Sequence, residues 1–123
     1  MEKICLGYDA ALDFLRGEPS TVEKLHYYAD QEEICISGVT LYNLLGTISK
    51  REVVISFANS VTILPFDRKA AVIANKLNRE LVGKGADAPS EFVMTAAVCM
   101  ANDAFLFTRK PANYEGMRGL KRV

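Results

Sequence analysis

The chain has 123 residues, of which 50% are hydrophobic and 24% are charged. This length and balance predict one globular domain over residues 1–123 and exclude wholesale disorder. Fifteen basic and fifteen acidic residues cancel, so net charge supplies no long-range attraction to nucleic acid. Any such contact depends on a local patch.

Short apolar runs alternate with helical patterns in the first half of the chain. Residues 4–6 predict a strand, followed by a helix for which Asp9 is the expected N-cap. Ser20 and Glu23 form a capping-box pattern that opens a second helix. Residues 33–37 and 61–66 predict two further strands, with helices between them through residues 41–45 and 49–58.

The second half continues this alternation. Asp67 is the expected N-cap of a long amphipathic helix that ends near Gly83, and Ser90 is the expected N-cap of an apolar helix through residues 93–101. Residues 104–108 predict a fourth strand and residues 120–123 a short fifth. Strands joined by helices predict an α/β domain with a mostly parallel sheet of four to five strands, covered on both faces. Functional sites in such sheets form at the carboxyl ends of the strands.

The cysteines and the N-terminus indicate the compartment. Cys5, Cys35 and Cys99 contain no CxxC pair and lie in apolar runs, so we expect buried thiols in a reducing compartment and not metal ligands or disulfides. The start MEKICLGYDA has no basic segment followed by a long apolar run, and no run of about 18 apolar residues occurs. We therefore expect a cytoplasmic protein without a signal peptide or membrane contact.

Four blocks of the chain resemble the PIN-domain family, and specifically its VapC-like toxin branch: ICLGYDAALDFLRGEP, ISGVTLYNLL, AAVCMANDAFLFTRK and NYEGMRGLKRV. The intervening LPFDRKAAVIANKLNRELVGKG is similar to the family's third strand and long helix. The resemblance covers nearly the whole chain and implies a three-layer PIN-like fold. For active members it also implies a metal-dependent endoribonuclease, in which clustered carboxylates hold Mg²⁺ or Mn²⁺.

Carried over residue by residue, the resemblance leaves no carboxylate at the acidic positions of the family. The aspartate that ends the first strand falls on Gly7, and the glutamate of the ISxxTxxE pattern falls on Asn43. The acidic position before the paired alanines falls on Phe92, its acidic neighbour on Ser90, and the position after the TR pair on Lys110. We therefore expect a degenerate site without a bound metal, with the Lys110 ammonium in the anionic pocket as a fixed counter-ion.

Three functions compete. The first is a binding or regulatory module without nuclease activity, in a toxin–antitoxin setting, with an antitoxin-like or toxin-like protein or RNA as its partner. The second is an active endoribonuclease toxin in which Asp9, Asp13 and Glu91 form a shifted Mg²⁺ or Mn²⁺ site. The third is a structural homodimer subunit built on the apolar helix from Met94 to Met100, because the resemblance implies a homodimer.

Several of these residues also have purely structural interpretations. Asp9 can be a helix cap, Asp13 an exposed helix residue and Glu91 a first-turn acid that the helix dipole stabilises. The lone His26 is expected to pack on the surface. Basic residues near Tyr114 form either an RNA-contacting rim, with the tyrosine stacked on a base, or a solvated tail beside a core tyrosine; they are Arg109, Lys110, Arg118, Lys121 and Arg122.

Overall fold

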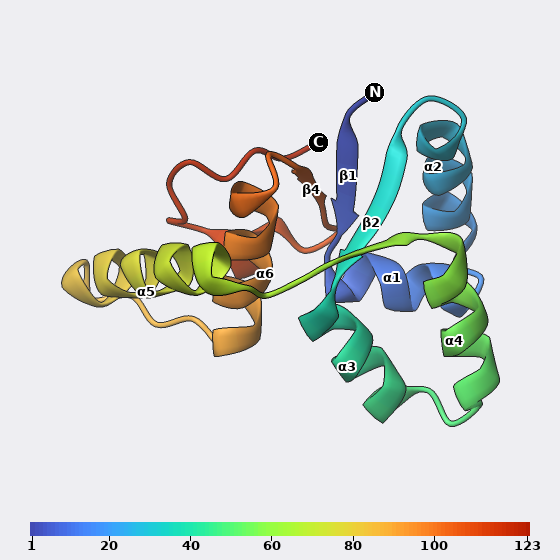
Figure 1. The fold of residues 1–123 in the computed structure, drawn as a ribbon, viewed down its shortest axis with the longest axis horizontal. Coiled ribbons are helices and arrows are strands. Elements are labelled where there is room, and N and C mark those ends of the chain that lie inside the picture. Colours follow the sequence, from blue (N-terminus) through green and yellow to red (C-terminus); the bar gives the residue numbers. More distant parts are fainter.

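One four-stranded parallel sheet lies between two layers of helices in the computed structural model, which describes residues 1–123 (Figure 1). In chain order the elements are β1 (Lys3–Leu6), α1 (Tyr8–Leu15), α2 (Pro19–Ala29), β2 (Glu33–Ser37), α3 (Gly38–Thr47), α4 (Arg51–Ser60), β3 (Thr62–Leu64), α5 (Arg68–Gly83), α6 (Ser90–Ala101), β4 (Phe105–Phe107) and the 3₁₀ turn η1 (Pro111–Tyr114). The strands lie in the order β3-β2-β1-β4. The predicted α/β class is confirmed. None of the helices combines the length and the apolar character that a membrane crossing needs.

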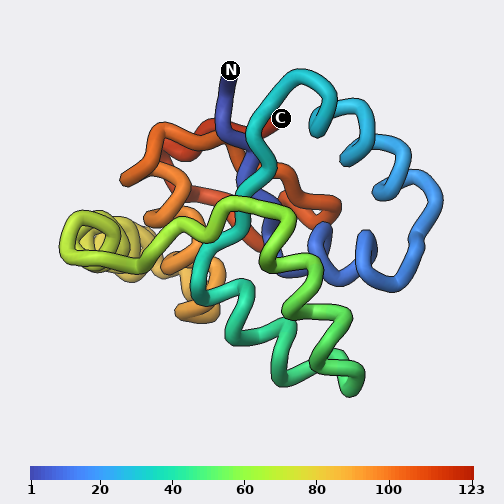
Figure 2. Tube along the Cα trace, turned by 45° about the vertical axis from the view of Figure 1, so that its right-hand side comes forward, coloured from blue at the N-terminus to red at the C-terminus, as the bar shows by residue number.

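The two faces of the sheet carry separate apolar cores, and Figures 1 and 2 show from two directions the helices that cover these faces. Alternate residues of a strand point to opposite faces, and β1 shows the consequence. Cys5 lies in the core beneath α5 and α6, whereas Ile4 and Leu6 lie in the core beneath α1, α2, α3 and α4. This division produces the three-layer arrangement.

The cysteines are buried as the sequence predicted. Cys5 of β1 stands opposite Cys35 of β2 in the parallel register, and both belong to the same core as Cys99 of α6. All three are free thiols with no solvent exposure. They therefore act as small apolar side chains in the packing.

The start of α2 differs from the predicted capping box. Glu18, not Ser20, is the N-cap, and its carboxylate accepts hydrogen bonds from the backbone N–H of Ser20 (3.2 Å) and of Thr21 (2.8 Å). Pro19 takes the first helical position, where its missing N–H costs nothing and its fixed φ suits the helix. The predicted role of Ser20 and Glu23 is therefore wrong because the proline starts the helix earlier.

The two predicted caps in the second half of the chain have different outcomes. Asp67 caps α5 as expected, since its Oδ1 accepts a hydrogen bond from the N–H of Ala70 at 3.1 Å. Ser90 is instead the first residue of α6, and Pro89 is at the N-cap position without a side-chain hydrogen bond. The residue at the N-cap position is a proline, whose side chain has no hydrogen-bonding group, so the expected serine cap is wrong.

The C-terminal segment forms a bridge and not the predicted fifth strand. Arg122 pairs with Leu106 in a single parallel bridge. The N–H of Leu106 donates to the carbonyl of Lys121 at 2.8 Å, and the N–H of Val123 donates back to Leu106 at 3.0 Å. This pairing covers the outer edge of β4.

Candidate functional site

Four chain segments meet at the carboxyl edge of the sheet, at the lower end of Figure 1. β1 leads through Gly7 into α1, β2 leads directly into α3, and β4 leads into residues 108–110. The first turn of α6 lies beside α3. Because β1, β2 and β4 are parallel, the turns that follow them fall on one edge, which is where sites form in such sheets.

Asp9 joins the first turn of α1 to the segment after β4. Its two carboxylate oxygens accept hydrogen bonds from the hydroxyl of Thr108 at 2.9 and 3.0 Å, and Oδ2 also accepts from the N–H of Arg109 at 2.7 Å. Gly7 is the N-cap of α1, without any side-chain cap. The structural interpretation of Asp9 as a helix cap is therefore wrong: this carboxylate is a tertiary link between segments about 100 residues apart.

Two neighbouring side chains occupy the space into which a side chain at Gly7 would project. A Cβ atom at this position would lie 2.9 Å from Oδ1 of Asp9 and 3.1 Å from the hydroxyl of Tyr114. Tyr114 is only 2% exposed. The carboxylate of Asp9 and the phenol of Tyr114 thus occupy the space beside the position onto which the family's first aspartate falls.

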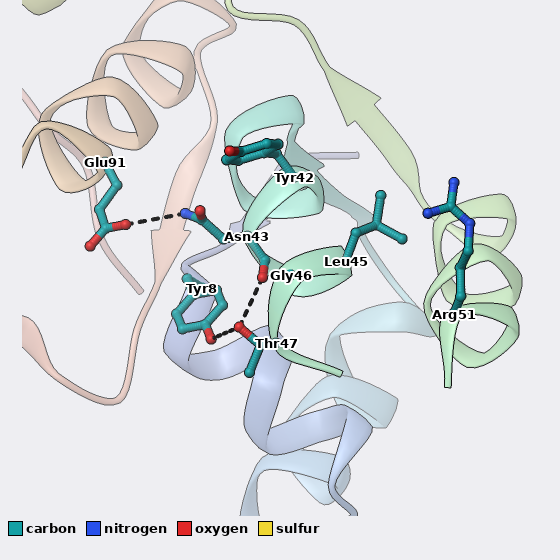
Figure 3. A pocket seen from close by; sticks show the side chains of 8 residues that line it. All are labelled: Tyr8, Tyr42, Asn43, Leu45, Gly46, Thr47, Arg51 and Glu91. Carbon is teal, nitrogen blue, oxygen red and sulfur yellow. Dashed lines mark hydrogen bonds between the residues drawn. The ribbon is translucent and has the colours of Figure 1, made fainter. Parts of the chain in front are cut away.

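Asn43 and Glu91 connect α3 to the first turn of α6, as the dashed line in Figure 3 shows. The Nδ2 of Asn43 donates to Oε2 of Glu91 at 3.3 Å. One turn further along α3, the hydroxyl of Thr47 donates to the carbonyl of Asn43 at 2.9 Å and lies 2.6 Å from the hydroxyl of Tyr8. A neutral amide therefore holds the exposed carboxylate.

These contacts border an open groove of about 720 Å³. Its polar groups are the phenols of Tyr8 and Tyr42, the amide of Asn43, the hydroxyl of Thr47, the guanidinium of Arg51 and the carboxylate of Glu91 (Figure 3). Tyr42 is 78% exposed. The groove is thus a surface that combines an exposed aromatic ring with one positive and one negative side chain.

Phe92 fills part of the same edge with an apolar body. Its ring meets the ring of Tyr114 edge-on, with the centroids 5.5 Å apart, and it packs against the core beneath α5 and α6. Burial raises the pKa of the Tyr114 phenol above its usual range, and the charges of Asp9 and Glu91 are among the groups that raise it further. The phenol therefore stays protonated, as a neutral group beside Gly7.

The donor set at this edge does not fit a Mg²⁺ or Mn²⁺ centre. Such hard cations need several convergent oxygen ligands, mostly carboxylates. The family positions offer no carboxylate, and nowhere in the chain do three His, Cys, Asp or Glu side chains come close enough to hold a metal ion. Asp9, Asp13 and Glu91 are therefore not gathered into one cluster. Asp9 is hydrogen-bonded to Thr108 and Arg109, whereas Glu91 is hydrogen-bonded to Asn43. Asp13 lies half-buried on α1, one turn after Asp9.

Lys110 does not lie where the sequence placed it. Its side chain is exposed, and the only ion pair in the chain joins Lys121 to Asp103. Lys110 therefore forms no ion pair and does not line the groove, so a role as counter-ion in the pocket stays a prediction. Its backbone N–H instead donates to the hydroxyl of Thr108 at 3.0 Å, which strengthens the link made by Asp9.

The five basic residues do not form one rim. All are exposed, but Arg109 and Lys110 follow the carboxyl end of β4, whereas Lys121 pairs with Asp103, which precedes β4. Tyr114 is buried, so it cannot stack on a base. Tyr114 is thus the core tyrosine of the second interpretation, whereas RNA contact by the basic residues stays a prediction. His26 is exposed on α2 as expected.

The sequence identified Thr108 only as the end of a predicted strand and as part of the TR pair, and it did not identify Arg51. Thr108 holds Asp9 from the far end of the chain, and Arg51 of α4 lines the groove. Arg51 belongs to no motif, and each residue reaches the edge only through the tertiary fold. The place of Thr108 at the end of a predicted strand was the available signal for a site residue.

No family model and no curated protein matches the chain, but solved structures do. VapBC2 from Rickettsia felis, bound to a DNA fragment from its promoter, aligns with a TM-score of 0.86 at 22% identity over 98% of this chain and 97% of that chain. DNA-bound VapBC from Salmonella typhimurium aligns at 0.87 and 21% over 100% and 98%. A toxin–antitoxin complex from Klebsiella pneumoniae aligns at 0.78 and 13% over 95% and 94%.

The chain has a PIN-like fold. This confirms the fold that the four sequence blocks implied, including its three layers. At sequence identities of 13 to 22%, these structures establish the fold of the chain alone. The chemistry at the carboxyl edge of the sheet has to be inferred from this chain's own side chains. In this chain that edge is built by the strand ends at Gly7 and Thr108 and by α3, which follows β2 and carries Asn43.

Proposed function

We propose that this chain is a PIN-like binding module of a toxin–antitoxin setting that takes a protein partner and has lost metal-dependent endoribonuclease activity. One observation carries the loss of activity: the two carboxylates that face this edge are held by neutral donors. Asp9 accepts from Thr108 and from the N–H of Arg109, and Glu91 accepts from Asn43. Each hydrogen bond occupies a carboxylate lone pair that a metal ion would need, and the two acids are bonded to different segments.

The groove supports the choice of a protein partner. Exposed tyrosine and arginine are the side chains that most often anchor protein interfaces, and Tyr42 and Arg51 lie on the same groove. The structures that share the fold include a toxin–antitoxin complex. An antitoxin-like or toxin-like protein that places a carboxylate near Arg51 and a donor near Glu91 fits this surface.

A second candidate has an observation in its favour. The carboxylate of Asp9 lies beside Gly7, close to the position where the fold family has its first aspartate. An endoribonuclease that uses Asp9, Asp13 and Glu91 with Mg²⁺ or Mn²⁺ therefore stays a defined alternative, which needs these acids to gather when a metal binds.

Cleavage and metal binding separate the two candidates. Purified protein is incubated with structured and unstructured RNA at increasing Mn²⁺, and its melting temperature is followed under the same conditions. The binding module predicts no cleavage and no metal-induced rise in melting temperature, since only a ligand of the native state stabilises it. Metal-dependent cleavage that disappears in both Asp9→Ala and Glu91→Ala would establish the nuclease.

The structural homodimer stays a prediction with its own test. α6 buries Val93 and Thr95–Cys99 against its own chain, so its apolar character needs no second copy. We propose that any homodimer forms through other surfaces. Sedimentation across micromolar concentrations measures this directly, and a monomer at every loading rules out an obligate dimer.

A further inference from the structure

A second pocket lies at the opposite end of the sheet from the groove. It is open, has a volume of about 300 Å³, and forms where β1 and β4 begin and α2 ends. The chain termini mark this end of the molecule in Figure 1. Three aromatic rings and two carboxylates dominate its lining, which comprises Glu2, Ile4, Tyr27, Tyr28, Gln31, Glu32, Phe105 and Val123.

The aromatic rings are arranged at an angle to one another. Tyr27 and Tyr28 meet edge to face, with ring centroids 5.5 Å apart, and Tyr27 is 62% exposed. The Nζ of Lys121 lies 4.6 Å from the centroid of the Phe105 ring. The ammonium of Lys121 therefore lies on the electron-rich face of Phe105, and the exposed ring of Tyr27 is the one that a further cation can reach.

The charged side chains that line the pocket are both acidic, and Lys121 lies outside this lining, over Phe105. Glu2 and Glu32 are its only charged residues, and neither forms an ion pair, because the one ion pair of the chain joins Lys121 to Asp103. Oε1 of Glu32 accepts a hydrogen bond from the N–H of Glu2 at 3.3 Å, which leaves its second oxygen without a protein donor.

The end of α2 adds to the negative potential. The N–H groups of Gln31 and Glu32 both donate to the carbonyl of Tyr28, at 3.1 and 2.7 Å. The other carbonyls of the last turn have no helical partner, and the negative end of the helix dipole favours a cation there. The aromatic faces, the carboxylates and the helix C-terminus thus all favour a positively charged ligand.

We propose that this pocket binds an organic cation of the methylated-ammonium class. Weakly hydrated cations with methyl groups gain from aromatic faces, whereas a hydrated metal ion prefers convergent oxygen ligands. The trimethylammonium group of a free small molecule and that of a methylated lysine on a protein share this chemistry. The inference is independent of the proposed function, since no residue of this pocket belongs to the groove at the carboxyl edge.

Titration of the full chain by amide NMR tests the pocket with three probes: choline, the neutral carbon analogue of choline with a tert-butyl group, and a short peptide with one trimethyllysine. We expect saturable shifts at residues 27–32 and near Phe105 with choline, and binding of the neutral analogue at least about tenfold weaker. If the peptide binds more tightly than choline, the natural ligand is a methylated lysine on a protein. If choline binds as tightly as the peptide or more tightly, the natural ligand is a small molecule.

Two variants and a matched control complete the test. Glu32→Gln keeps the shape and removes the charge, Tyr27→Leu removes one aromatic face, and each is expected to weaken choline binding about fivefold or more. Tyr42→Leu replaces an exposed tyrosine of the other groove and should leave it unchanged. The proposal is overturned if neither cation gives saturable shifts in the folded wild type, or if the neutral analogue binds as well as choline. It is also overturned if Tyr42→Leu weakens choline binding as much as Tyr27→Leu does.

Discussion

The hydroxyl of Thr108 lies within hydrogen-bond distance of both carboxylate oxygens of Asp9, at 2.9 and 3.0 Å. This contact fastens the first turn of α1 to the segment that follows β4. Asp9 is half-buried, so these protein donors take the place of part of its solvent shell. An acid that resembles a catalytic residue by its place in the chain therefore serves as a structural link.

Removing this link is expected to destabilise the fold. Asp9→Asn retains the shape but loses the charge, and Thr108→Val loses the donor, so each should lower the free energy of unfolding by about 2 kcal/mol. Urea denaturation measures the change. Asp13→Asn, one turn along the same helix, is the matched control and should change stability by less than about 0.5 kcal/mol. Equal losses in Asp9→Asn and Asp13→Asn would contradict the link.

Gly7 should not tolerate a larger residue. In Gly7→Ala the new methyl group lies 2.9 Å from Oδ1 of Asp9, and we expect a loss of about 1–3 kcal/mol from overpacking. Gly46→Ala is the control, because nothing lies within 4 Å of its Cβ position; it should stabilise α3 by about 1 kcal/mol. Chemical denaturation of Gly7→Ala with and without Asp9→Ala measures the coupling, and purely additive losses would contradict the clash.

A carboxylate at position 43 is expected to create a metal response that the wild type lacks. Asn43→Asp brings a second acid to Glu91, where the wild-type amide lies at 3.3 Å. Repulsion between the two acids should lower the melting temperature, and Mn²⁺ should raise it again by binding between them. Asn59→Asp, at an exposed position of α4, controls for added charge. If Mn²⁺ does not raise the melting temperature of Asn43→Asp, a cause other than the missing carboxylate at position 43 keeps cations from this edge.

The cap of α2 predicts a change of stability in acid. The Thr21 side chain, followed by the N–H groups of Thr21 and Ser20, holds the pKa of Glu18 down to about 2 from 4.5. A lowered pKa stabilises the fold fully above pH 4.5, and this contribution disappears as the pH falls to about 2. Glu18→Gln should therefore melt below wild type at pH 6 and approach it at pH 2. Thermal melts at both values check this, and a constant gap would contradict it.

The sequence predicted the elements of the fold because their signals are local. Residues 33–37 were identified as a strand with correct bounds, and Asp67 was identified as a cap, since both signals occupy a few adjacent residues. Leu120–Val123 failed as a strand because pairing with β4 stops after one bridge at Arg122. Whether a short apolar segment pairs depends on its neighbour, which its own residues do not reveal.

The candidate site was predictable only in its location. Gly7, at the end of β1, and Asn43, on the helix that follows β2, were correctly assigned to one edge, because parallel strands align their carboxyl ends. Lys110 was expected inside the pocket, whereas its side chain is exposed and its backbone N–H is bonded to Thr108. The link from Thr108 to Asp9 spans 99 positions, and no local pattern encodes such a contact.

The stacking of Cys5, Cys35 and Cys99 within one core has a practical consequence for measuring how this domain opens. Burial raises the pKa of the Cys35 thiol to about 12, and a thiol, unlike a thiolate, reacts slowly with alkylating reagents. Alkylation of these cysteines in the native protein is therefore expected only when the sheet and α6 separate. The rate of labelling then reports how often the central layer is exposed, with no added probe and no change to the sequence.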